Sequence, residues 1–159
     1  MNDIIDSFGN PACDSVRESI RVEIVKHWDE QEIVGLYGAA GWWKEGMDPG
    51  RIPELILGSF LFAVAIDIST GKAVGTGRVI SDGVADAYIQ DLVVLARWRG
   101  SDVGRMIVSA LLDGCRAHKL SWVGLIAEPG TEGFYSSIGF SPMVGYIPML
   151  YSSILTEAV

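Results

Sequence analysis

A chain of 159 residues, 49% apolar and 20% charged, has the size of one domain and can bury a sizeable core, which excludes a disordered protein. Its formal net charge of −8 at pH 7 gives it no electrostatic reason to bind nucleic acid or an anionic membrane surface. The longest apolar run, Leu55 to Ile66, is shorter than the roughly 20 residues that span a bilayer. We therefore expect no nucleic-acid partner and no membrane partner.

The N-terminus and the cysteines indicate a cytoplasmic protein. Residues 1–6 lack the basic segment and the long apolar stretch of a secretory signal. Cys13 and Cys115 stand far apart and do not cluster with His27 or His118, so neither a disulfide framework nor a zinc site is expected. Free thiols in a reducing compartment and no metal cofactor follow as expectations.

The first half of the chain predicts a strand and two helices after an irregular arm at residues 1–15. Alternation of apolar and polar residues predicts a half-buried strand at 19–26. Asp29 is the expected N-cap of a helix, because Glu32 stands three residues later as in a capping box. A second short helix is expected at 48–57, with its proline at the first helical position. The expected buried face of the first helix consists of Ile33, Leu36 and Tyr37.

The second half mixes strands with helices. Apolar segments rich in β-formers and separated by short turns predict three strands at 60–68, 73–80 and 85–95. The hydrophobic period then changes to that of a helix at 103–118. The remaining expected elements are a strand at 122–127, a short helix at 131–138 and a final strand region at 143–151. This order predicts an α+β protein with a mainly antiparallel sheet covered by helices.

The turn between the strand at 85–95 and the helix at 103–118 is a candidate anion site. Gly100 and Gly104 would let the backbone approach a ligand closely. A helix N-terminus presents unpaired N–H groups and the positive end of the helix dipole, which favour phosphate. Positive charge is added here by Arg97, Arg99 and Arg105. Taken alone, the segment is equally consistent with an ordinary strand-to-helix turn.

A second motif favours the anion site over an ordinary turn. It reads Phe134-Tyr135-Ser136-Ser137-Ile138-Gly139-Phe140. Together with the turn Arg99-Gly100-Ser101-Asp102-Val103-Gly104, it resembles the GNAT superfamily of N-acetyltransferases, whose FYxxxGF signature is intact here. The resemblance extends from about Ile20 to Tyr151. It implies one GNAT-like domain over 1–159, with a mixed, mainly antiparallel central sheet in α/β/α layers.

The resemblance also implies where acetyl-CoA would bind as cosubstrate. Backbone amides of the turn would hold the coenzyme A pyrophosphate, and the strand stretch before it would pair with the pantetheine arm. The implied coenzyme-binding residues are Leu92, Val93, Val94, Arg99, Gly100, Ser101, Asp102, Val103, Gly104 and Arg105. Two of the family's usual residues differ: Asp102 replaces the first motif glycine, and Glu128 replaces an asparagine that contacts the pantetheine arm.

The catalytic residues implied by the resemblance are Tyr135 and Asp91. Tyr135 matches the tyrosine that protonates the departing thiolate as a general acid. Asp91 matches an aspartate that assists the amine in glucosamine-phosphate acetyltransferases. Tyr88 occupies the position of the catalytic glutamate of the histone-acetylating branch, so that base is missing. A structural role for Asp91, or deprotonation through a water chain, stays open.

The acceptor pocket is expected beside Trp42 and Trp43, with Tyr88 as a further candidate substrate-binding residue. Adjacent tryptophans in a loop can form an aromatic wall for a cation or an apolar amine. They can equally cover the core. The expected function is acetylation of a small-molecule primary amine by direct transfer. The alternatives are a non-catalytic acyl-CoA-binding module or an acetyltransferase for protein N-termini or lysines, and the resemblance leaves a homodimer open.

Overall fold

The structure is a computed structural model that describes residues 18–151. The expected N-terminal arm and Cys13 lie outside the described residues. The described residues divide into two compact units, with the boundary after residue 125. None of the helices described between residues 18 and 151 combines the length and the hydropathy of a membrane span.

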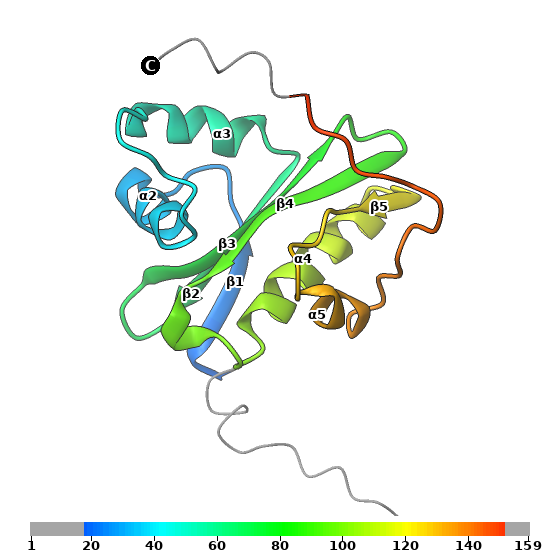
Figure 1. Ribbon diagram of the computed structural model, residues 1–159. Helices are drawn as coiled ribbons and strands as arrows, with labels where there is room; N and C mark the ends of the chain where they lie inside the picture. The colour runs from blue at the N-terminus through cyan, green and yellow to red at the C-terminus, as the bar shows by residue number, and fades with distance from the viewer. Residues whose placement is uncertain (1–17, 152–159) are drawn as a thin grey trace, which may run out of the picture. The chain divides into compact units, whose positions relative to one another are not determined.

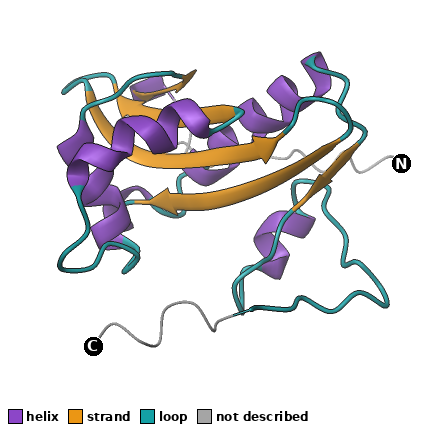
Figure 2. Ribbon diagram, turned by 90° about the horizontal axis from the view of Figure 1, so that it is seen from above, coloured by secondary structure: helices purple, strands orange, loops and turns teal. Residues whose placement is uncertain are grey.

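The first unit is built on one sheet of five strands in the order β1-β2-β3-β4-β5 (Figure 1). Neighbouring strands are antiparallel from β1 to β4, whereas β5 runs parallel to β4. Two long strands lie side by side in opposite directions with a clear twist in Figure 2. The strands are β1 Ile20–Ile24, β2 Leu61–Asp67, β3 Lys72–Ser81, β4 Asp86–Val94 and β5 Trp122–Gly124.

Helices cover both faces of this sheet. Figure 1 shows α2 and α3 on one side of it and α4 on the other, which confirms the α+β class and the layered arrangement. The helices of this unit are α2 Glu30–Ala39, the 3-10 turn η1 Pro49–Arg51, α3 Ile52–Gly58, the 3-10 turn η2 Ala96–Trp98 and α4 Val103–Ala117. Because β2 lies between two helical layers, all seven of its residues are buried, which explains the unbroken apolar sequence of its first six residues, before Asp67.

The core on the α2 side joins helix and sheet residues in one cluster. Its fully enclosed members include Ile33 and Leu36 of α2, Ile56 of α3 and Phe62 of β2. The face expected from the helical spacing is confirmed, because Ile33, Leu36 and Tyr37 are the buried residues of α2.

On the opposite face, α4 lies close to β3 because β3 presents glycines there. A Cβ added at Gly75 would stand 2.8 Å from the backbone oxygen of Val93 and 3.0 Å from Ile107 Cδ1. One added at Gly77 would stand 3.0 Å from Ile107 Cγ2. The absence of side chains at these two positions therefore determines how closely the helix approaches the sheet.

The start of α2 agrees with expectation at Asp29 and differs at Glu32. Asp29 is the N-cap, and its Oδ1 accepts a hydrogen bond from the Glu32 N–H at 3.0 Å. The Glu32 carboxylate does not complete a capping box. Its Oε2 accepts instead from Trp28 Nε1 and from the backbone N–H of Ala73, both at 2.9 Å, and so connects α2 to β3.

The second unit contains α5 Glu132–Ser136, shorter than the helix expected at 131–138. The final strand region predicted at 143–151 is wrong, since no strand occurs in the described residues after β5. Gly145 takes a left-handed φ of +83°, and a turn forms as Tyr146 N–H donates to Met143 O at 3.2 Å. Pro148 also lacks the N–H that a strand would use, so the apolar pattern is not enough to form one. The strand expected at 122–127 likewise ends at Gly124.

Candidate active site

A β-bulge in β4 places Asp91 in an unusual backbone conformation. The β3–β4 register shifts by one residue between Thr76 and Arg78, so Asp91 and Leu92 together oppose Gly77. Asp91 has a φ of +55°, in the left-handed region that aspartate tolerates better than most side chains. The bulge therefore interrupts the alternation of β4 immediately before the stretch expected to hold the pantetheine arm.

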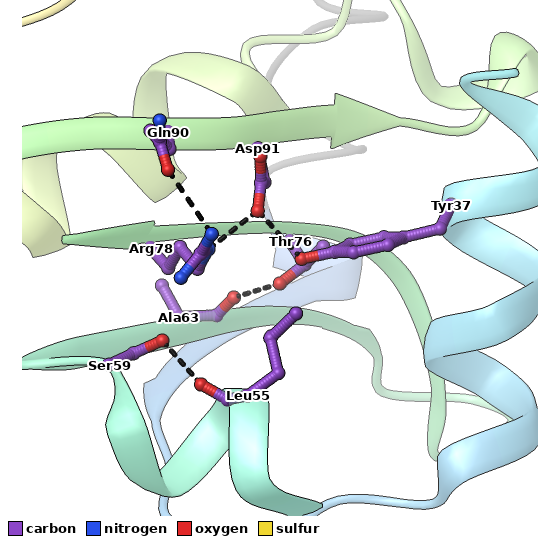
Figure 3. A network of polar contacts seen from close by, with 8 residues as sticks. All are labelled: Tyr37, Leu55, Ser59, Ala63, Thr76, Arg78, Gln90 and Asp91. Atoms are coloured by element: carbon purple, nitrogen blue, oxygen red, sulfur yellow. Dashed lines mark hydrogen bonds and ion pairs between the residues drawn. The ribbon is translucent and has the colours of Figure 1, made fainter. Parts of the chain in front are cut away.

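The Asp91 side chain is the centre of a polar network that joins β3, β4 and α2 (Figure 3). Its Oδ2 accepts from Arg78 Nε at 2.5 Å and from the Tyr37 hydroxyl at 3.0 Å. Arg78 also donates from Nη2 to Gln90 Oε1 at 3.1 Å. The carboxylate is thus held from two directions through a single oxygen.

Partial burial strengthens this network. The side chains of Arg78 and Asp91 are 18% and 26% exposed, so their ion pair is screened less than a surface pair, while the carboxylate stays within reach of a ligand. Burial, and after it the charge of Asp91, raises the pKa of Tyr37 well above its ordinary value. Tyr37 is therefore a hydrogen-bond donor, rather than a base, at any working pH.

One edge of β4 is open beyond this point. β5 pairs with β4 only from Asp86 to Tyr88, in parallel with Trp122 to Gly124. In residues 18–151 no strand pairs with Ile89–Val94 on that side. An extended chain with amide groups could add there as a further strand, which is how a pantetheine arm would bind.

The turn after β4 has the geometry of an anion site. Gly100 adopts a φ of +73°, and Asp102, with a φ of +63°, is the N-cap residue of α4 without making a side-chain capping bond. The N–H groups of the first turn of α4 have no carbonyl partner within the helix and can bind an anion. Arg99 is held over the end of β4, where its Nε donates to Val94 O at 2.9 Å.

Asp102 carries the charge that would oppose a pyrophosphate here. Its Oδ1 accepts from Arg105 Nε at 3.3 Å, and both side chains are about one third exposed, at 32% for Asp102 and 37% for Arg105. The arginine therefore partly compensates the carboxylate. The left-handed backbone also explains why a glycine would suit this position.

In the second unit, Tyr135 is packed by the rest of its own motif. Its ring makes edge-to-face contacts with Phe134 and Phe140, at centroid distances of 5.0 and 5.9 Å. The Phe140 N–H donates to Tyr135 O at 3.1 Å, a closure that Gly139 permits with its φ of +110°. Burial, and next the charge of Glu128, raises the pKa of the Tyr135 hydroxyl, which keeps it protonated as an acid requires.

Trp42 and Trp43 are half-buried and pack against the α2 core cluster. Their backbone N–H groups both donate to Tyr37 O, at 2.9 and 3.2 Å. The alternative that these residues cover the core is thus borne out, whereas their role in an acceptor pocket stays a prediction. Tyr88 is half-buried in β4, opposite Ile80 of β3 and Gly124 of β5.

A family model described as the acetyltransferase (GNAT) domain matches residues 58–142 of this chain. The chain belongs to the GNAT acetyltransferases. The matched segment begins at the last residue of α3 and includes the β4 bulge, the turn before α4 and the motif around Tyr135.

Individual proteins similar to this chain are also named as acetyltransferases. The uncharacterized N-acetyltransferase ycf52 of Pyropia yezoensis is 26% identical over 129 residues, which cover 80% of this chain and 74% of that protein. Serotonin N-acetyltransferase 2, chloroplastic, of Oryza sativa subsp. japonica is 36% identical over 73 residues, 46% of this chain and 36% of that protein. The solved structure of a GNAT-family acetyltransferase from Streptococcus pneumoniae TIGR4 has the same fold, with a TM-score of 0.69 at 21% identity over 85% of this chain and 98% of that one.

Sequence reasoning did not anticipate the residues that hold Asp91 in this GNAT domain. Tyr37 was expected only as a core residue, and Arg78 and Gln90 had no expected role. A signal was present, because Arg78 is a charged residue in a strand whose other residues after Lys72 are apolar or small. Counting the hairpin register back from Ser81 and Ala87 places Arg78 opposite Gln90, beside Asp91.

Proposed function

We propose that this GNAT enzyme transfers the acetyl group of acetyl-CoA directly to the primary amine of a small molecule. One observation carries the proposal: a carboxylate, Asp91, is fixed at a bulge immediately before the open edge of β4. An ammonium bound at Asp91 would thus lie next to the strand stretch proposed to hold the thioester arm. The rice relative is named for serotonin, itself a primary amine, which supports this substrate class.

Acetyl-CoA fits the residues of the first unit. The pantetheine arm would pair with Leu92, Val93 and Val94, and the pyrophosphate would bind at the turn 99–105. The observed features that suit it are the unpaired edge of β4, the left-handed Gly100 and the N-terminus of a fifteen-residue helix. When bound, the coenzyme supplies the acetyl group as a thioester.

Tyr135 and Asp91 would share the proton transfers. The neutral amine attacks the thioester carbonyl, and the departing thiolate takes a proton from the Tyr135 hydroxyl. Before the attack, the bound ammonium would lose one proton to Asp91 or to water. After it, the nitrogen would lose a second proton, which replaces the one that Tyr135 donates. Trp42, Trp43 and Tyr88 would line the acceptor pocket, where the tryptophan rings can contact the apolar body of the amine or its cation.

We further propose that the chain acts as one domain, because the family match runs without a break across the boundary between the two compact units at residue 125. Location in the cytoplasm, the absence of a metal and a homodimer stay predictions. The rice relative is named as chloroplastic, so the compartment is best tested directly by fractionation.

The test is release of free thiol from acetyl-CoA in the presence of amine panels. We expect release with at least one small primary amine, together with a rise in melting temperature when coenzyme A is added. Acetylation of peptide N-termini or lysines, with no small amine accepted, would overturn the substrate class. A melting temperature unaffected by coenzyme A would overturn the cosubstrate.

A further inference from the structure

Tyr37 contacts the two elements that the proposed function assigns to the acceptor. Its hydroxyl donates to Asp91 Oδ2 at 3.0 Å. Its ring meets Trp42 edge to face, with a centroid distance of 5.6 Å and an interplanar angle of 81°. Its carbonyl oxygen accepts the N–H groups of both Trp42 and Trp43. With 7% of its surface exposed, Tyr37 is enclosed by these partners.

The way Asp91 is held leaves one oxygen for a ligand. Tyr37 and Arg78 both bind Oδ2, and Oδ1 receives no hydrogen bond from residues 18–151. A carboxylate has acceptor capacity on each oxygen, so Oδ1 can bind an ammonium while Oδ2 stays in the network. The side chain is 26% exposed, which gives a ligand access.

We infer that Tyr37 is a positioning residue for the acceptor amine, fixing both the direction of the Asp91 carboxylate and the place of the Trp42–Trp43 loop. The inference rests on the proposed function, because it assumes that Asp91 and the loop bind the acceptor. Tyr37 contacts both Asp91, which would bind the charged end of the amine, and the Trp42–Trp43 loop, which would contact its apolar body. Tyr37 therefore sets the position of these two parts of the site relative to each other. Loss of either contact should therefore affect acceptor binding, but not coenzyme binding.

The two contacts of Tyr37 can be separated by substitution. Tyr37→Phe removes the hydroxyl bond to Asp91 and keeps the ring against Trp42. Tyr37→Leu removes both. The matched control is Ser59→Ala, which deletes another enclosed hydroxyl bond, from Ser59 Oγ to Leu55 O at 2.7 Å (Figure 3). This bond involves neither Asp91 nor Trp42.

The assay measures KM and kcat with saturating acetyl-CoA for 2-phenylethylamine, which has an aromatic body, and for ethylamine, which has none. We expect Tyr37→Phe to raise KM about tenfold for both amines, as a lost bond to a charged group would, with the KM for acetyl-CoA unchanged. Tyr37→Leu should in addition reduce the preference for 2-phenylethylamine over ethylamine. Ser59→Ala should leave both amine KM values and their ratio as in the wild type.

The inference is overturned if Tyr37→Phe leaves the amine KM unchanged, or if Tyr37→Leu keeps the wild-type preference between the amines. Should either variant fail to fold, Trp42→Leu carries the test, because it removes the ring that Tyr37 orients. It must raise the KM for 2-phenylethylamine more than that for ethylamine, and an unchanged ratio refutes the inference. Failure of the proposed function would give a different result from failure of this inference. The wild type itself would then turn over neither these amines nor any other small amine.

Discussion

Two aspartates adopt left-handed backbone conformations, one just before the proposed coenzyme stretch and one within it. Asp91 has a φ of +55° and Asp102 a φ of +63°. Such a conformation costs a non-glycine residue about 1 kcal/mol or more, and the surrounding structure must offset this cost. At Asp91 the hydrogen bonds from Arg78 and Tyr37 offset this conformational cost. At Asp102 the bond from Arg105 contributes to the offset.

Asp102→Asn should strengthen coenzyme A binding. Asparagine tolerates the left-handed backbone and removes the charge that would repel a pyrophosphate. We expect a dissociation constant about fivefold lower, measured by calorimetry, with a smaller gain at high salt. Unchanged or weaker binding would mean that the pyrophosphate does not lie at this turn.

Tyr135→Phe should lower kcat about a hundredfold, because the departing thiolate would lose its proton donor. Coenzyme A affinity should stay within about twofold, since the ring and its packing against Phe134 and Phe140 remain. Steady-state thiol release and a coenzyme titration measure the two quantities. The control is Tyr146→Phe, an exposed tyrosine of the same unit, which should keep wild-type kcat. Equal kcat in the two variants would argue against the acid role.

The raised pKa of Tyr37 predicts a pH-dependent contribution to stability. A folded-state pKa above the unfolded value near 10 stabilises the protein fully below pH 10, and this contribution is lost as the pH rises further. The free energy of unfolding of the wild type should therefore exceed that of Tyr37→Phe at pH 8, and the gap should narrow above pH 10. Urea titrations from pH 8 to pH 11 measure this gap. A constant gap would show that the hydroxyl is not enclosed as described.

At the scale of the elements, the contact between α4 and β3 positions the turn that begins α4. Ile107 of α4 packs over Gly75 and Gly77 of β3, so a side chain at either glycine would push the helix away. Because the first turn of α4 is the proposed pyrophosphate site, its placement depends on these two glycines as well as on the local turn sequence.

Gly75→Ala should destabilise the protein by about 1–3 kcal/mol through overpacking, because the new Cβ would stand 2.8 Å from a backbone oxygen that cannot move alone. The matched control is Gly35→Ala in α2, where nothing lies within 4 Å of the added Cβ. There alanine should stabilise the helix by up to about 1 kcal/mol. Urea unfolding measures both changes. Equal stabilities of the two variants would contradict this description of the helix–sheet contact.

At the scale of the whole molecule, the net charge of −8 should attract a cationic acceptor and be sensitive to salt. We expect the KM for a protonated amine to rise about twofold or more between 0.05 and 0.5 M NaCl, as screening weakens the attraction. The kcat for the same amine should change less, because the chemical step takes place between bound groups. A KM independent of salt would mean that the acceptor is bound mainly by its apolar body.

Several features could be predicted from the sequence because they depend on residues close together in the chain. The N-cap at Asp29, the hairpin turns and the helix from Val103 follow from periodicity and from side-chain bonds over two or three residues. The motif around Tyr135 also closes on itself, by a bond from Phe140 to Tyr135. The family, and with it N-acetyl transfer, could therefore be inferred before the fold was known.

Only the tertiary structure shows what holds Asp91. Its partners Arg78 and Tyr37 are 13 and 54 residues away in sequence, and the bulge that brings Arg78 beside it arises from strand register. The Glu32 carboxylate accepts a hydrogen bond from the Ala73 N–H, 41 residues away, instead of completing a local cap. The segment at 143–151 has an apolar pattern but no strand, because a strand needs a paired neighbour that the pattern cannot supply. Local interactions thus determined most of the elements and the motif around Tyr135, whereas pairing and packing between distant segments decided the surroundings of Asp91, the proposed acceptor residue.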